Sequence, residues 1–155
     1  MYWRMQLHPD EPKKSVMHAV TCLSSGNIGL DFAGNIGDLK ELLNRKDLPD
    51  GQQDCWDFAH TMKPGDVVLI MAHHFPVALC RVEGDYNYIR EPDPSIGWFR
   101  HFRKVKVVGY YADYVTDARS WQQIAMTDTI SSLHDENSKS YRLIQAWLDA
   151  SGDHA

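Results

Sequence analysis

Two apolar segments joined by a short connection restrict the fold of this chain more than any other feature. Residues 67–72 (VVLIMA) and 77–82 (VALCRV) are dense in branched side chains, and residues 73–76 (HHFP) lie between them. Such segments at this separation are typical of two neighbouring antiparallel strands. We therefore predict a β-hairpin over residues 67–82.

Further segments with alternating or β-branched residues add strands to this hairpin. They are residues 2–7, 28–32, 86–89 and 102–111. In residues 28–32, the period of two places Asp31 on the face opposite its apolar neighbours. In residues 102–111, the same alternation turns Val105 and Val107 inward and Lys104 and Lys106 outward.

Short helices are predicted around these strands. Helical spacing of apolar residues indicates helices at 15–24, at 38–43 and in the segment before the 63–66 turn (KPGD). Two more helices are predicted within 120–150, where Ser120 and Gln123 form a capping box at the start of the first. Because βαβ alternation is missing, we predict an α+β fold: a small pseudo-barrel of about five or six mostly antiparallel strands with short peripheral helices.

Length and composition fit a single globular domain spanning residues 1–155. The chain has 155 residues, of which 43% are hydrophobic and 24% charged, enough for one core. No apolar run reaches the roughly 18 residues that span a bilayer, so we expect a soluble, cytoplasmic protein without a membrane partner.

The three cysteines form no CxxC pair, which predicts buried, reduced thiols. No catalytic, cofactor or metal motif is recognised, so no enzyme activity is predicted.

The charge distribution is uneven. A net charge of −5 counts against nucleic-acid binding, because phosphate binding usually requires a basic excess. Residues 99–106 (FRHFRKVK) nevertheless contain no acid. A basic strand on an acidic protein can still follow a phosphate backbone with modest, salt-sensitive affinity, although a solvated strand face is the plain alternative. The candidate phosphate contacts are Arg81, Arg100, His101, Arg103, Lys104 and Lys106.

Six short motifs occur in the order seen in one known family. They are residues 2–5 (YWRM), 28–32 (IGLDF), 37–39 (GDL), 62–68 (MKPGDVV), 82–88 (VEGDYNY) and 101–106 (HFRKVK). Over residues 2–111 the chain resembles EVE-type domains of the PUA-like group, which includes YTH and ASCH domains. The resemblance is strongest to the N-terminal domains of modification-dependent restriction endonucleases. It implies a pseudo-barrel with a pocket for a flipped, modified nucleobase.

The residue types present suit that pocket. The carboxylate of Asp31 can accept a hydrogen bond from the exocyclic amine of cytosine, and aromatic rings can stack on a base. The chain departs from many relatives by having Phe32 and Val107 where tryptophans are common. The candidate pocket residues are Asp31, Phe32, Trp98, Tyr86, Tyr88, Trp3 and Trp56. Each also has a structural interpretation: an exposed turn for Asp31 and packing for the aromatic side chains.

These observations predict a reader of a modified base in DNA. We expect 5-methylcytosine or 5-hydroxymethylcytosine as the favoured base, with N6-methyladenine as another candidate. The resemblance suggests the specificity part of a restriction or defence system, with any nuclease in a separate domain. The alternatives are a binder of modified RNA, an ASCH-like nucleoside amidohydrolase using Asp31 with Lys63 or Lys104, and an interaction domain without a base pocket.

Overall fold

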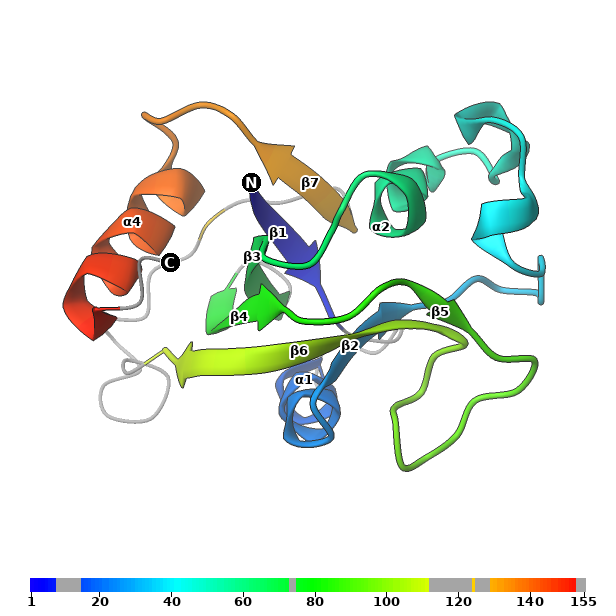
Figure 1. The fold of residues 1–155 in the computed structure, drawn as a ribbon, viewed down its shortest axis with the longest axis horizontal. Coiled ribbons are helices and arrows are strands. Elements are labelled where there is room, and N and C mark those ends of the chain that lie inside the picture. The colour runs from blue at the N-terminus through cyan, green and yellow to red at the C-terminus, as the bar shows by residue number, and fades with distance from the viewer. Residues whose placement is uncertain (8–14, 73–74, 112–123, 125–128, 153–155) are drawn as a thin grey trace.

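A curled mixed β-sheet forms the centre of the molecule (Figure 1). The computed structural model describes residues 1–7, 15–72, 75–111, 124 and 129–152. The strands are β1 (Tyr2–Gln6), β2 (Asn27–Leu30), β3 (Val67–Ala72), β4 (Phe75–Val82), β5 (Asn87–Tyr88), β6 (His101–Tyr110) and β7 (Ile130–Leu133). They are arranged in the order β2-β6-β4-β3-β1-β7, and β5 pairs with β6. This α+β architecture confirms the predicted fold class of a small, barrel-like sheet with short helices.

Short helices lie around the sheet. They are α1 (Ser15–Ser24), α2 (Trp56–His60) and α4 (Lys139–Ser151), with the 3-10 turns η2 (Leu39–Glu41), η3 (Arg45–Asp47) and η4 (Gln53–Cys55). The helix predicted over residues 15–24 therefore has the expected bounds. Asp38 begins η2 by accepting a hydrogen bond from the Lys40 amide, and Ser138 begins α4 in the same way through Tyr141.

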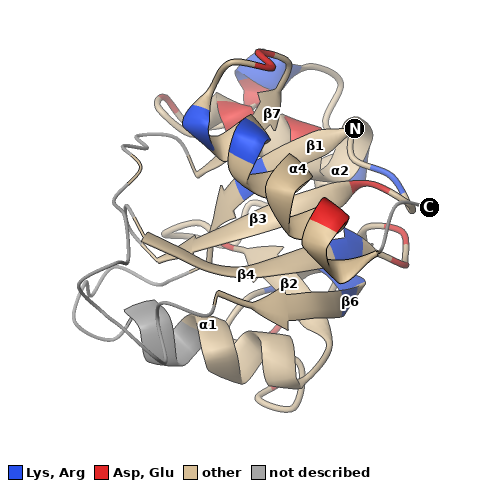
Figure 2. Ribbon diagram, turned by 90° about the vertical axis from the view of Figure 1, so that its left-hand side faces the viewer, with Lys and Arg blue, Asp and Glu red and all other residues tan. Residues whose placement is uncertain are grey.

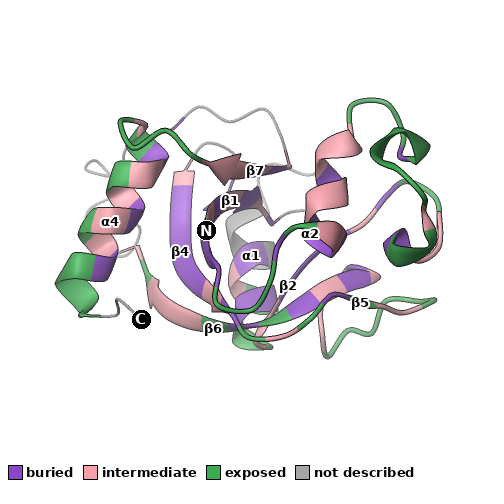
Figure 3. Cartoon of the chain, turned by 45° about the horizontal axis from the view of Figure 1, so that its top comes forward, coloured by how far each residue is buried: buried purple, intermediate pink, exposed green. Residues whose placement is uncertain are grey.

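The hairpin of β3 and β4 is confirmed, and β3 is buried along its whole length. Val68 and Ile70 belong to one hydrophobic cluster, whereas Val67 and Leu69 belong to another. Since side chains of a strand alternate between faces, the sheet has a core on each side. Figure 3 shows the same burial along β4 and the alternation along β6.

Different helices cover the two faces. The first cluster includes residues of α1 and α2, and the second includes Ile144 and Leu148 of α4. Helix α4 lies against β1 (Figure 2).

The cysteines Cys22, Cys55 and Cys80 are free and buried, as predicted. Burial raises the pKa of Cys80 to about 12, so this thiol is uncharged at neutral pH.

Three features differ from the sequence-based expectations. Strand β7 was not predicted; it pairs antiparallel with β1, which is also paired in parallel with β3. The strand expected over residues 28–32 ends at Leu30, so Asp31 follows β2 rather than lying within it. The capping box at Ser120 and Gln123 lies outside the described residues.

Gly29 permits the close approach of β2 to the segment before β6. A Cβ atom at this position would collide with the ring of Phe99 and with the carbonyl oxygen of His101. Phe99 itself is completely buried. The glycine of the 28–32 motif is therefore needed for packing.

Replacing Gly29 should destabilise the protein. We expect Gly29→Ala to lower the free energy of unfolding by about 1–3 kcal/mol, because the added methyl overpacks the site. Urea denaturation measures this change. Gly34→Ala is the matched control, since no atom lies within 4 Å of a Cβ built there. Equal stability of the two variants would contradict the packing role.

Candidate functional site

Aromatic side chains surround His101 at the start of β6. The His101 ring centroid lies 5.4 Å from Phe32, 5.9 Å from Tyr86 and 5.2 Å from Tyr88. Phe32 meets the imidazole edge-on, and Tyr86 is stacked against it. We call Phe32, Tyr86, Tyr88 and His101 the aromatic cluster. The structure thus brings together three of the predicted pocket residues around a histidine.

His101 is a buried, neutral imidazole. It is 0% exposed, and its Nδ1 lies 2.7 Å from the Tyr86 hydroxyl. Burial lowers the pKa of His101 to about 4, with Arg100 acting in the same direction and Asp31 and Asp38 opposing it. The predicted role of His101 as a phosphate contact is therefore wrong, because the ring is inside the protein and uncharged at neutral pH.

The other ring nitrogen of His101 is unsatisfied. Among the described residues, Nε2 has no hydrogen-bond partner although it is buried. The indole Nε1 of Trp98, another predicted pocket residue, is in the same condition. A buried polar atom without a partner costs about 1–3 kcal/mol, so such atoms are uncommon and often mark a place for a water molecule or ligand.

Asp31 is held by a basic residue rather than exposed. Its Oδ2 accepts from the Arg100 guanidinium at 2.9 Å and from the Arg100 amide at 3.2 Å, and its Oδ1 accepts from the Phe32 amide at 2.8 Å. The carboxylate is therefore fixed next to the aromatic cluster. Oδ1 accepts one hydrogen bond among the described residues, whereas a carboxylate oxygen can accept two.

The three predicted tryptophans lie in different places. Trp3 is 0% exposed and donates from Nε1 to Asp66 at 2.9 Å, so the prediction that it lines the pocket is corrected: it belongs to the core. Trp56 stacks on His60 with ring centroids 3.7 Å apart. Trp98 is half-buried and meets Phe99 edge-on.

The basic residues of β6 divide between its two faces. Lys104 and Lys106 are exposed, as the alternation predicted, and Lys106 is the cross-strand neighbour of Arg81 on β4. Arg103 is only 2% exposed. The prediction that Arg103 contacts the nucleic-acid backbone together with Lys104 and Lys106 is therefore corrected, since its side chain is buried on the other face of β6.

Arg103 instead connects four segments. Its guanidinium donates to the carbonyl of Phe58 in α2 at 2.8 Å, to Met62 at 2.6 Å and to Gly84 at 3.0 Å. It also lies over the Phe58 ring, 5.7 Å from the centroid. Burial lowers the pKa of Arg103, but a guanidinium remains charged at any physiological pH.

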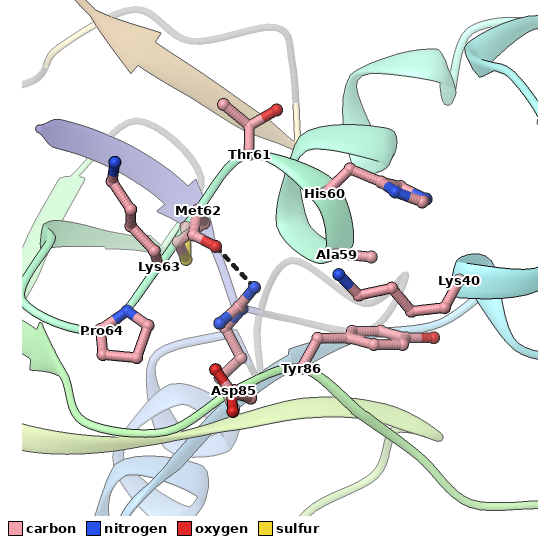
Figure 4. A pocket seen from close by; sticks show the side chains of 10 residues that line it. Lys40, Ala59, His60, Thr61, Met62, Lys63, Pro64, Asp85 and Tyr86 are labelled. Atoms are coloured by element: carbon pink, nitrogen blue, oxygen red, sulfur yellow. Dashed lines mark hydrogen bonds between the residues drawn. The ribbon is translucent and has the colours of Figure 1, made fainter.

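A cleft of about 550 Å³ opens beside Arg103 (Figure 4). Its charged and aromatic lining residues are Lys40, His60, Lys63, Asp85, Tyr86 and Arg103. Of the residues predicted for the base pocket, Tyr86 is the one that lines this cleft. Sequence reasoning missed Lys40 and His60, because they lie in different elements and share no motif. Lys63 was considered only for the hydrolase alternative and not as part of a cleft with Arg103.

The described part of the chain contains no group of three or more metal-ligating side chains placed to hold an ion. Within the same part, no helix combines the length and apolar character needed to cross a bilayer. Asp31 is hydrogen-bonded to Arg100 and Phe32 rather than to the lysines of the hydrolase alternative.

Fold and site together define a small α+β domain with a curled mixed sheet, a buried aromatic cluster and a cleft lined by basic residues. Residues 3–136 match the profile of a domain of unknown function, DUF8426. The chain belongs to the DUF8426 family. A search of curated proteins found no match.

The burial of His101 predicts a pH dependence of stability. In the unfolded chain its pKa is about 6.5, whereas in the folded protein it is about 4. Between these values the unfolded state binds a proton that the folded state does not, so the free energy of unfolding falls as the pH falls. The contribution is at most about 3 kcal/mol.

Urea denaturation between pH 4 and pH 7, done in parallel on the wild type and on His101→Gln, measures this contribution. We expect the wild type to lose more stability than the variant as the pH falls, since other titrating groups are common to both. Parallel stability curves would show that His101 is not protected from protonation.

Proposed function

We propose that this domain binds DNA and holds one modified base, extruded from the duplex, beside the aromatic cluster. 5-Methylcytosine or 5-hydroxymethylcytosine is the favoured base, ahead of N6-methyladenine. The observation that carries the proposal is the buried Nε2 of His101, which has no partner among the described residues although aromatic rings surround it. Since His101 is fully buried, a polar group of the base reaches this atom only if the surrounding rings move apart on binding.

The free-energy cost of extruding a base must be offset by several contacts in the binding site. Extruding a base costs a few kcal/mol, and stacking on one aromatic ring returns about 1–3 kcal/mol. The half-buried rings of Tyr88 and Trp98 are suited to such stacking. A single buried methyl group adds only about 0.8 kcal/mol, so discrimination also needs polar contacts to the edge of the base.

Asp31 is the proposed edge reader. Its Oδ2 is already bonded to Arg100, and the second acceptor position of Oδ1 suits the exocyclic amine of cytosine. Arg100 holds the carboxylate in a fixed orientation through two hydrogen bonds to Oδ2, and a charge-assisted hydrogen bond is stronger than a neutral one.

Lys104 and Lys106 on β6, together with Arg81 on β4, are the proposed contacts to the DNA backbone. Lys106 and Arg81 are cross-strand neighbours, so their side chains leave the sheet close together. The whole chain carries a charge of −5, and for this reason we expect modest affinity that decreases steeply with salt. In a restriction or defence system this domain would supply recognition, while cleavage would come from another domain.

A binding titration tests the proposal. Fluorescence anisotropy compares otherwise identical oligonucleotides with cytosine, 5-methylcytosine, 5-hydroxymethylcytosine or N6-methyladenine at low salt. We expect one modified oligonucleotide to bind at least about fivefold more tightly than its control, a difference of about 1 kcal/mol. Asp31→Asn should remove this preference, because it replaces one of the two acceptor oxygens by an NH2 donor and removes the negative charge.

Lys104→Gln is the matched variant for a backbone contact. We expect it to weaken the binding of modified and unmodified oligonucleotides by the same factor, since phosphate contacts carry no base information. The proposal fails if no modified oligonucleotide binds better than its control. If Asp31→Asn and Lys104→Gln behave alike, the assigned role of Asp31 is wrong.

A further inference from the structure

Arg103 carries a buried charge whose direct partners are backbone carbonyls and the ring of Phe58, while the carboxylates of Asp85 and Asp66 act on it without forming an ion pair. The three hydrogen bonds of its guanidinium go to backbone carbonyls, and among the described residues it forms no ion pair. A guanidinium has five N–H groups, so two are left after these three bonds. A desolvated cation of this kind is stabilised by an anion within reach.

The cleft beside Arg103 is the place from which an anion would reach it. Figure 4 shows the Lys40 ammonium extending into the cleft from the side opposite Met62, where the dashed line marks the bond from Arg103. Lys63 lies on the same side as Met62, with its ammonium turned away from Asp85 (Figure 4), and Asp85 is the one acidic residue among the lining residues. The lining is therefore locally basic on a chain whose net charge is −5.

We propose that this cleft binds a phosphate group, with Arg103 at its floor and Lys40 and Lys63 at its rim. Guanidinium and ammonium groups together are well suited to phosphate, the first by directed hydrogen bonds and the second as a mobile point charge. The volume of about 550 Å³ is typical of pockets for small organic ligands. The phosphate is thus expected to be carried by a nucleotide, whose base or sugar lies along Tyr86.

This inference does not depend on recognition of a modified base. Three N–H groups of Arg103 bind backbone carbonyls. The proposed phosphate would accept hydrogen bonds from the other two. Tyr86 borders both places, since its hydroxyl contacts His101 and its side chain lines the cleft. A ligand without any base modification therefore tests the cleft separately from the reader function.

Isothermal titration calorimetry of the full chain at low ionic strength tests the site with three probes: inorganic phosphate, cytidine 5′-monophosphate and cytidine. We expect cytidine monophosphate to bind at least about tenfold more tightly than cytidine, because only the former carries the anion. Tight binding of inorganic phosphate would identify free phosphate as the source, and much weaker binding would identify a nucleotide. No saturable binding of either phosphate compound, or equal binding of cytidine and its monophosphate, would overturn the proposal.

Rim variants avoid the risk that replacing Arg103 unfolds the protein. Lys40→Gln and Lys63→Gln should each weaken binding of cytidine monophosphate about threefold to tenfold, as expected for a partly exposed ion pair. Lys46→Gln is the matched control, since Lys46 is exposed in η3 and does not line the cleft. Equal weakening by Lys46→Gln would contradict a defined site.

Asp85, the one acidic residue that lines the cleft, provides a variant that should strengthen binding rather than weaken it. Asp85→Asn should tighten binding of the monophosphate about twofold to fivefold, because it removes a repulsive charge. Glu83→Gln makes the same change in net charge at an exposed residue outside the lining and should leave binding unchanged. If both variants tighten binding equally, the monophosphate responds to the net charge of the protein and not to a site in the cleft.

Discussion

The buried guanidinium of Arg103 determines how the parts around the sheet are placed. It connects the Phe58 carbonyl in the middle of α2, the Met62 carbonyl before the turn and the Gly84 carbonyl to one strand, β6. Because removing a partner from buried carbonyls is costly, these segments are held at defined distances from one another. The shape of the cleft follows from this arrangement, since its walls are the segments that Arg103 connects.

The aromatic cluster and the cleft are two neighbouring environments with different chemistry. Around His101 the surroundings are apolar and the imidazole is neutral, whereas beside Arg103 the side chains are basic. Tyr86 belongs to both, since its ring and hydroxyl contact His101 and its side chain also lines the cleft. Such a pair of environments fits a ligand that has both an aromatic part and an anionic part.

Much of the sheet was predictable, because local patterns determine it. The β3–β4 hairpin and the alternation of Lys104, Val105 and Lys106 follow from branched residues and a period of two. The inward position of Arg103 was visible in the same alternation, since it shares its parity with Val105, but its charge suggested the surface. Strand β7 escaped prediction because its sequence, ISSL, is short and half polar. Contacts such as Asp31 with Arg100 depend on tertiary structure and have no local signal.

The position of β1 sets an order for folding. This strand lies between β3 and β7, with Trp3 opposite Val68 on one side and Ser132 on the other. During synthesis β1 emerges before either neighbour, so it stays unpaired until β3, which ends at residue 72 of the 155, has also emerged. Pairings between such distant segments slow folding, because a long loop must close before any contact is gained. We therefore expect the local β3–β4 hairpin to pair before β1 is added to it.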